Sequence, residues 1–307
     1  MVHRRSGFLK DFKRCWQLHL FLLIGVAFIL IFSYYPMLGI QLAFKDFNPA
    51  KGIWGSEWVG FKHFQTFFRS SDFLRVIKNT LVTSLYSLVV SFPLAIVFAL
   101  QLNIMRRERL KKSIQTITYL PHFISTVVIV GMINQILSPV SGLYGALYRL
   151  FSDKMYPPDI LGDSSAFVHI YVWSGVWQSL GWDSILYLAA LSGVSQELHE
   201  AAMLDGANRF QRVIHVDLPS ISVTIAIMLI LRAGTIMNVG FEKVFLMQND
   251  AVISVSETIS TYTYKMALVN NQFSFSTAVS LLNTIVNFVV LFIVNFVAGK
   301  VGDTSLW

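Results

Sequence analysis

The chain has 307 residues, of which 54% are hydrophobic and only 13% are charged, and its mean hydropathy is +0.58. A soluble globular domain typically carries roughly 25% charged residues, so this composition argues against a water-soluble protein and favours an integral membrane protein. The formal net charge of +7 does not indicate nucleic-acid binding, because the basic residues are few and gather at the ends of apolar runs. A single cysteine, Cys15, excludes an internal disulfide.

Six long apolar runs follow one another along the chain. A helix of ~20 apolar residues, rising ~1.5 Å per residue, crosses a hydrocarbon core of ~30 Å. Prolines at positions 93 and 121 lie inside the second and third runs, where neighbouring helices can satisfy the freed carbonyl groups. The pattern predicts an all-α integral membrane protein with six transmembrane helices, at about 18–40, 77–102, 114–137, 166–193, 221–247 and 273–298.

The basic segment 1–16 before the first run also fits a secretory signal peptide. The apolar core of a signal peptide is shorter than this run, however. Tyr34, Tyr35 and Pro36 follow it, where a cleavage site would need small residues. We therefore expect a retained transmembrane helix.

The distribution of Lys and Arg predicts the orientation of the chain. Segments 1–16, 103–113, 194–220 and the tail from 299 contain thirteen of these residues, whereas segments 41–76, 138–165 and 248–272, which are longer in total, contain eight. Short loops rich in Lys and Arg face the cytoplasm. We expect both termini, including the short tail 300–307, and the 194–220 loop to be cytoplasmic.

The polar loop at 194–220 is the most informative stretch. It predicts a short helix, a turn at Gly206, a second short helix, and Pro219 opening the fifth span. Glu200-Ala-Ala is followed after three residues by Gly206, and after nine more by Val216 and Leu218-Pro219. This spacing resembles the EAA loop of ABC importer membrane subunits, in which Ile is usual where Val216 stands.

Seven further motifs stand in order along the chain, and together with the loop they resemble the polysaccharide-uptake branch of the sugar ABC permeases. Asp183 departs from that pattern, in which a small or neutral residue is expected. The motifs are Ser33-Tyr-Tyr-Pro-Met, Ala43-Phe-Lys-Asp-Phe, Trp58-Val-Gly, Asn79-Thr-Leu, Tyr119-Leu-Pro-His-Phe, Gly181-Trp-Asp-Ser-Ile-Leu-Tyr-Leu-Ala-Ala-Leu and Asn238-Val-Gly-Phe-Glu.

The resemblance implies a type I importer in a bacterial cytoplasmic membrane. This subunit would pair with a second, related permease, bind two cytoplasmic ATPase subunits, and receive oligosaccharides of the aldouronate type from an extracytoplasmic solute-binding protein. The chain lacks a GxxxxGK[ST] phosphate loop, so ATP and Mg²⁺ are expected on the partner ATPase and no cofactor in this chain. His199-Glu200 is followed by Met203, which breaks the zinc-protease pattern, and we expect no metal site and no enzyme activity.

In such an importer, closure of the ATPases on ATP would move the loop and thereby the fourth and fifth helices. We expect Glu200 at the start of the first loop helix, where the helix dipole stabilises a carboxylate. The resemblance implies that Glu200 also meets a basic residue of the ATPase, and a plain charge preference is the alternative. The predicted coupling residues are Glu200, Ala201, Ala202, Asp205, Gly206, Val216, Leu218 and Pro219.

Charges inside a membrane usually face a cavity or a partner. Counted along helices, Asp183 and Arg232 each lie roughly 15–17 Å from the cytoplasmic edge. They could pair as a gate, line a sugar cavity in which Arg232 contacts hydroxyls or a uronate carboxylate, or form a purely structural ion pair. The candidate residues of the substrate path are Trp177, Trp182, Asp183, Arg232, Asn238, Asn283 and Asn287.

Aromatic and polar stripes supply the other candidates. Trp177 and Trp182 could stack on a sugar ring, while Trp173, nearer the outer end, is expected to be an interface anchor. Hydrogen bonding to the partner permease is favoured over sugar contact for the polar stripe of the last span. That stripe comprises Ser280, Asn283, Thr284 and Asn287.

Three other functions stay open at this point. An ABC permease for an amino acid, peptide or polyamine is disfavoured by the long-range motifs. A self-sufficient carrier or channel would usually show internal repeats or more spans. An intramembrane enzyme lacks candidate catalytic residues. ATP-dependent uptake and co-purification with an ATPase would separate the ABC permeases from the other two.

Overall fold

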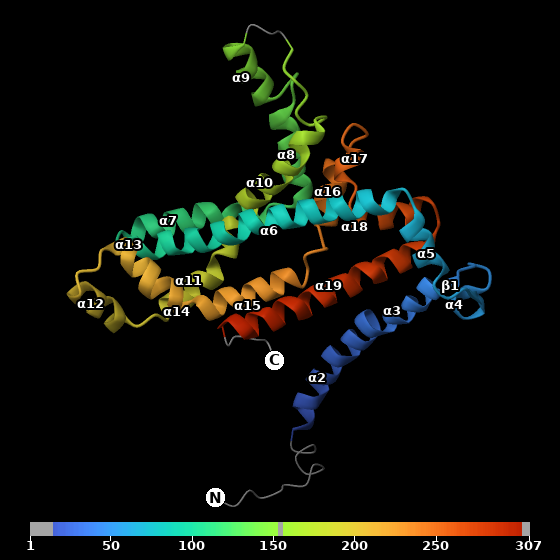
Figure 1. Cartoon of the computed structure of the whole chain (residues 1–307), viewed down its shortest axis with the longest axis horizontal. Coiled ribbons are helices and arrows are strands. Elements are labelled where there is room, and N and C mark those ends of the chain that lie inside the picture. The colour runs from blue at the N-terminus through green and yellow to red at the C-terminus, as the bar shows by residue number, and fades with distance from the viewer. Residues whose placement is uncertain (1–14, 153–155, 303–307) are drawn as a thin grey trace, which may run out of the picture.

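The computed structural model describes residues 15–152 and 156–302 of the chain. The basic residues before Cys15 and the tail from residue 303 lie outside the described residues, and so do most of the two predicted cytoplasmic tails. Most of the described residues form helices, and two short strands pair in a two-stranded sheet (Figure 1). Three helices are long and apolar enough to cross a membrane, or up to five if each of two sharply bent helix pairs is one span.

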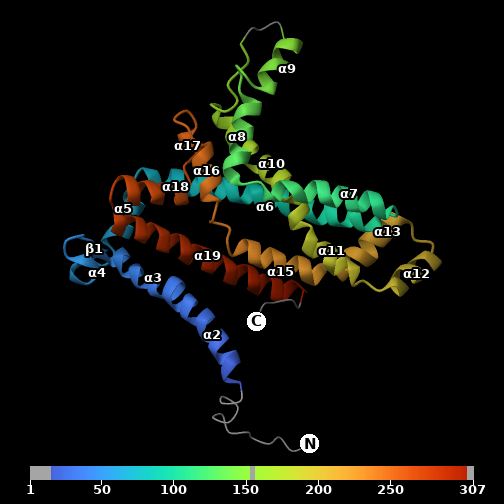
Figure 2. The ribbon, with the colours of Figure 1, turned by 180° about the vertical axis from the view of Figure 1, so that it is seen from behind.

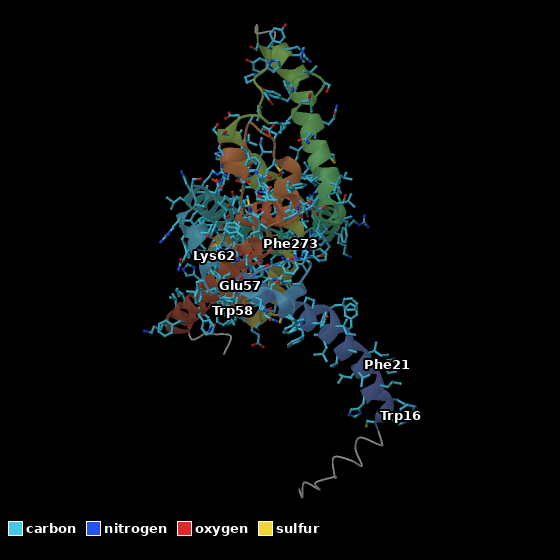
Figure 3. All side chains as sticks on the ribbon, turned by 90° about the vertical axis from the view of Figure 1, so that its right-hand side faces the viewer. Trp16, Phe21, Glu57, Trp58, Lys62 and Phe273 are labelled. Carbon is cyan, nitrogen blue, oxygen red and sulfur yellow. The ribbon has the colours of Figure 1, made fainter. Side chains whose placement is uncertain are left out.

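The first apolar run is a chain of helical pieces that begins away from the rest of the molecule. It consists of α2 (Trp16–Ile29), a π-helical turn (Leu30–Tyr34), α3 (Tyr35–Met37) and a 3-10 helix (Leu38–Phe44). Figure 3 shows Trp16 and Phe21 far from the helical body, and Figure 2 shows α2 leaving it at an angle. Of this run, the C-terminal 3-10 helix packs against the rest of the molecule, and Ala43 in it is buried against Ala278 of the last helix.

A small hairpin follows this run. Strands β1 (Lys45–Asp46) and β2 (Glu57–Trp58) pair antiparallel around α4 (Gly52–Gly55), and α5 (Lys62–Arg69) comes next. Phe44 stacks on Trp58 with ring centroids 5.7 Å apart, and the Phe47 ring meets Phe273 at 5.9 Å. The second contact attaches the hairpin to Phe273, the first residue of the last helix (Figure 3).

Helix α6 (Asp72–Ile104) is a single helix of 33 residues. At 1.5 Å per residue it is ~50 Å long, well beyond the ~30 Å of a hydrocarbon core. Near its start, the Asn79 amide donates to the carbonyls of Ser254 and Glu257 at 2.9 and 3.1 Å, and Thr80 Oγ1 accepts from the Ile259 amide at 2.9 Å. The Arg75 guanidinium pairs with the buried Glu257 carboxylate. This end of α6 is thereby fixed to the segment 254–259.

The third apolar run is bent rather than straight. Helix α7 (Glu108–Tyr119) leads into a 3-10 turn (Leu120–Phe123), and α8 (Thr126–Leu137) departs at 99°. Pro121 cannot donate a backbone hydrogen bond, and Ser125 caps the new helix by accepting from the Val128 amide. The predicted span 114–137, with Pro121 inside it, is therefore two helices, and α9 (Leu143–Phe151) follows them.

The fourth run forms α10 (Ser164–Asp183) and α11 (Ile185–Ser192), which are separated at the buried Ser184. The fifth run differs from the prediction, because α15 (Ser222–Ala233) ends at Ala233. Its 12 residues measure ~18 Å, too short to cross alone. The chain is unwound over 234–240 before α16 (Phe241–Met247) begins.

The last part of the chain consists of α17 (Ile253–Ser256), α18 (Ile259–Tyr264), a π-helical turn (Lys265–Val269) and α19 (Phe273–Gly302). Helices α6 and α19 both begin near α5 and run in the same direction (Figure 1). One hydrophobic cluster joins α6, α11 and α15 and contains Ala99, Tyr187 and Ile221. A second cluster, which contains Phe67, Tyr262 and Phe275, joins α5, α18 and α19.

Candidate functional site

The loop between the fourth and fifth runs folds as a helix, a turn and a second helix, as predicted. Helix α12 (Gln196–Leu204) begins at the N-cap Ser195, whose hydroxyl accepts from the Glu197 amide at 3.2 Å. Gly206 has φ +78°, a left-handed conformation that costs glycine little. Asn208 and Gln211 then form a reciprocal capping box that starts α13 (Arg209–Arg212). Figure 1 shows α12 at one extremity of the molecule.

The second loop helix continues through a π-helical turn (Val213–Asp217) into α14 (Leu218–Ser220). Pro219 lies inside this last piece, and the chain bends by 61° only after it, at the junction with α15. The proline therefore does not open the fifth apolar helix as the sequence suggested. Val216 and Leu218 are half-buried beneath the loop.

Glu200 occupies a different position in its helix from the predicted one. The acidic residue in the first turn of α12 is Glu197, and Glu200 lies one turn further along. Stabilisation by the helix dipole falls off within the first turn, so that physical reason for Glu200 was wrong. Glu200, Ala201, Asp205 and Gly206 are all exposed, and Ala202 is half-buried.

The loop also exposes large apolar side chains. Leu204 is 90% exposed and Phe210 is 71% exposed, and Leu198 and Met203 are about half exposed. Four large apolar side chains are thus exposed within one short polar loop, which is typical of a segment that binds another protein. We call this exposed apolar surface the loop patch, and it comprises Leu198, Met203, Leu204 and Phe210.

Beneath the loop, one carboxylate is buried. Asp217 is 3% exposed, and its Oδ1 lies 3.3 Å from both His199 Nε2 and Asn103 Nδ2. These contacts join the base of the fifth run to α12 and to the end of α6. A cavity of about 410 Å³ opens beside them, and its lining includes Arg106, Arg209 and Arg212.

The structure brings Asp183 and Arg232 into contact. Arg232 Nη2 lies 2.7 Å from Asp183 Oδ2, and the arginine side chain is 49% exposed while the carboxylate is 19% exposed. Arg232 and Ser91 of α6 line each of three neighbouring cavities, with volumes of about 300, 210 and 270 Å³. Arg232 of the predicted pair therefore lies where the three cavities adjoin one another.

The two tryptophan candidates have different environments. Trp182 lines the cavity of about 300 Å³ and stacks on His122 with ring centroids 4.3 Å apart and planes 3° apart. Trp177 is 50% exposed and lines none of these three cavities. Trp173 donates from Nε1 to the Tyr86 hydroxyl at 3.1 Å.

The asparagine candidates form one amide cluster. The side-chain amides of Asn283 and Asn287 each donate to Asn238 Oδ1 at 3.0 Å, and Asn287 Oδ1 accepts from the Met237 backbone amide at 2.9 Å. Within this chain they hold the unwound segment 234–240 against α19. These hydrogen bonds lie inside the chain, and bonding of the stripe to a partner permease stays a prediction. Asn238 also lines the cavity of about 210 Å³.

Lys243 was missed by the sequence reasoning. It is 8% exposed, its Nζ donates to the Tyr171 carbonyl at 3.0 Å, and it lines the cavity of about 270 Å³ together with Arg232. The available signal was its charge inside the predicted span 221–247. Only Asp183 and Arg232 were singled out on that criterion.

Long apolar helices that surround cavities lined by serine, amide and charged side chains, together with a folded, projecting loop, are the architecture of a membrane transport permease. The chain belongs to the family described as binding-protein-dependent transport system inner membrane component, whose pattern matches residues 91–303. The resemblance to the sugar ABC permeases is thereby confirmed.

Among curated relatives, protein LplB of Bacillus subtilis (strain 168) is 40% identical over 96% of this chain and 92% of its own length. The polygalacturonan/rhamnogalacturonan transport system permease protein YteP of the same organism is 38% identical over 94% of this chain and 90% of its own. A chain of a bacterial ABC transporter involved in the import of the acidic polysaccharide alginate superposes with a TM-score of 0.88 at 37% identity. That match covers 96% of this chain and 99% of the other.

A second crystal structure, of a bacterial alginate ABC transporter in complex with an alginate pentasaccharide-bound periplasmic protein, has the same TM-score of 0.88 at 36% identity. It covers 97% of this chain and 99% of the other. At 37% and 36% identity, these two chains share both their fold and their class of activity with this chain. The chain is a permease of the sugar ABC importer class.

Proposed function

We propose that this chain is one of two permease subunits of an ATP-driven importer of oligosaccharides, and that the loop 194–220 transmits ATPase closure to the helices. The exposed loop patch carries this proposal. Leucine, methionine and phenylalanine side chains at such exposures cost free energy in water unless a protein covers them. The loop is connected directly to the elements that line the polar cavities, α11 through Ser192 and α15 through Ser222.

The proposed topology has six crossings with both termini in the cytoplasm. Three long helices and the bent α7–α8 pair supply four of them. Helix α15, continued by the segment that ends with α16 at Met247, supplies another. The α10–α11 pair supplies the sixth, with 29 residues over 164–192. The excess of Lys and Arg on segments 1–16, 103–113 and 194–220 supports the cytoplasmic orientation of the loop.

The proposed partners are a second related permease, two cytoplasmic ATPases and an extracytoplasmic binding protein. Two observations support a protein partner inside the membrane. Helix α2 buries no residue in this chain, and the structurally similar chains come from assembled transporters, one of them with a periplasmic protein bound. Bacterial cytoplasmic membrane is the proposed location, and ATP with Mg²⁺ belongs to the ATPase partners.

The decisive experiment is purification of the tagged chain from its native cells, with identification of the accompanying proteins, followed by ATP-dependent oligosaccharide uptake in proteoliposomes. We expect an ABC ATPase to co-purify. Glu200→Gln and Gly206→Arg should abolish uptake while leaving assembly of the permease intact.

Glu197→Gln is the matched control, because Glu197 lies on the same exposed helix one turn earlier. It should retain uptake. Normal uptake by the Gly206→Arg variant, or purification without an ATPase, would overturn the proposed coupling.

A further inference from the structure

We propose that Lys243, together with Arg232, binds the carboxylate of an acidic sugar inside the permease, so that Lys243 sets the preference for uronic-acid oligosaccharides over neutral ones. The inference rests on the proposed function as an oligosaccharide permease and names its substrate class. Four features of the cavity of about 270 Å³ support it.

The first is that the Lys243 ammonium is buried without a counter-charge. The residue is 8% exposed, and no carboxylate among the described residues lies within 4.0 Å of its Nζ. Its Nζ contacts the Tyr171 carbonyl at 3.0 Å and the Tyr171 ring, whose centroid is 5.0 Å away. An ammonium carries three donors, so two remain for a ligand.

The second is the balance of charge in the cavity. Its charged lining residues are Lys243, Arg232 and Asp183, and the last two are paired at 2.7 Å. One positive charge is therefore in excess. Uncompensated charge within a membrane protein is costly, and a monoanionic ligand would balance it.

The third is the space around the ammonium. Gly175 of α10 faces it, and a Cβ at position 175 would lie 3.4 Å from Lys243 Nζ. A Cβ alone would make an ordinary van der Waals contact with the ammonium, whereas a longer side chain would fill the space beside it. The same wall carries the half-buried Gln178 and Ser179.

The fourth is the neutral polar lining. Ser87 and Ser91 of α6, with Gln178 and Ser179 of α10, supply hydroxyl and amide groups of the kind that bond sugar hydroxyls. The combination of two cations with neutral hydrogen-bonding groups fits a sugar that bears a carboxylate.

The test measures equilibrium binding to the purified transporter complex in nanodiscs, without the binding protein, so that any selectivity belongs to the membrane subunits. The probes are trisaccharides of galacturonate and of alginate, each compared with its carboxyl-reduced neutral counterpart. We expect wild type to prefer the acidic sugars. Lys243→Gln should weaken acidic binding on the order of 10- to 100-fold and leave neutral binding within about twofold.

Three further variants test whether the charge of Lys243 and the space beside it determine the preference for acidic sugars. Lys243→Arg should retain the preference because it retains the charge. Gly175→Leu should reduce acidic binding by filling the space beside Nζ, with the lysine still present. Lys112→Gln, which removes an exposed lysine of α7 that lines none of these cavities, should change neither affinity.

Equal loss of acidic and neutral binding in Lys243→Gln, with a lowered melting temperature, would show a structural lysine and overturn the inference. Equal affinity of wild type for both sugars, or unchanged preference in the variant, would also overturn it. Displacement of the acidic sugar by chloride at equal concentration would show an anion site of no sugar specificity and count against it. Absence of any ATP-driven oligosaccharide uptake by wild type would instead remove the proposed function itself.

Discussion

His199 Nε2 lies 3.3 Å from the buried carboxylate oxygen Oδ1 of Asp217. Because His199 belongs to α12 and Asp217 to the helix that leads into the fifth run, the contact fixes one half of the loop to the other. Asn103 donates to the same oxygen at 3.3 Å and brings the end of α6 into the arrangement. Movement of α12 should therefore reach α6 and α15 together.

Asp217→Ala should destabilise the protein by about 1–3 kcal/mol, because it leaves the polar atoms of His199 and Asn103 without their acceptor. Thermal unfolding in detergent measures the loss. Asp205→Ala, which removes an exposed carboxylate from the same loop, is the control and should shift the melting temperature much less. Equal shifts for the two variants would contradict the buried network.

Gly206→Ala should reduce coupling through backbone strain alone. No atom lies within 4 Å of a Cβ at this position, and φ is +78°, where a non-glycine residue costs ~1–2 kcal/mol. Gly206→Asn should be tolerated better, because asparagine visits this conformation more readily. ATP-dependent uptake should rank wild type first, the asparagine variant second and the alanine variant last; the reverse order of the variants would refute this account.

Asn287→Ala should cost about 1–3 kcal/mol, because the Met237 backbone amide loses its acceptor in a buried position. The unwound segment 234–240 would then loosen from α19. Thr284→Ala is a suitable control, since its hydroxyl bonds only to the Ser280 carbonyl of its own helix. Faster hydrogen exchange at Met237 in the Asn287 variant, and not in the control, is the expected signature.

Asp163 gives a prediction of pH dependence. Its carboxylate accepts from the Ser165 backbone amide and hydroxyl, each at 2.8 Å, and these bonds lower the pKa of Asp163 below its ordinary 3.8. A lowered pKa means that the stabilisation is complete above the ordinary value and is lost as the pH falls through the lowered pKa. Wild type should melt higher than Asp163→Ala at neutral pH, and the difference should disappear in strong acid. A difference that grows on acidification would contradict this assignment.

Much of this architecture could be predicted because a helix that crosses a membrane needs a long apolar run, and such runs are visible in the sequence. The apolar runs located the helices, and the spacing from Glu200 to Pro219 located the loop. Depth counting brought Asp183 and Arg232 to the same level, and the structure joins them at 2.7 Å. Each of these inferences depends on periodicity or on the cost of a local charge.

What the sequence could not show depends on contacts distant along the chain. The break after Ala233 is invisible in an apolar run, because it is stabilised by amides from Asn283 and Asn287 about 45 residues away. The 99° bend after Pro121 could have been a mild kink. The contact between Asp217 and His199 could not be predicted, because it depends on how the two halves of the loop fold against each other.

The length of α6 has a mechanical consequence. Asn79, near one end, is bonded to the Ser254 and Glu257 carbonyls, and Asn103, near the other, is bonded to the carboxylate beneath the loop. A continuous helix hardly shortens or stretches, because backbone hydrogen bonds brace its turns, and Pro93 removes only one of them in α6. Helix α6 is therefore rigid along its axis, and we expect a displacement of the loop at one end to reach the segment 254–259 at the other end directly, without passing through a flexible joint.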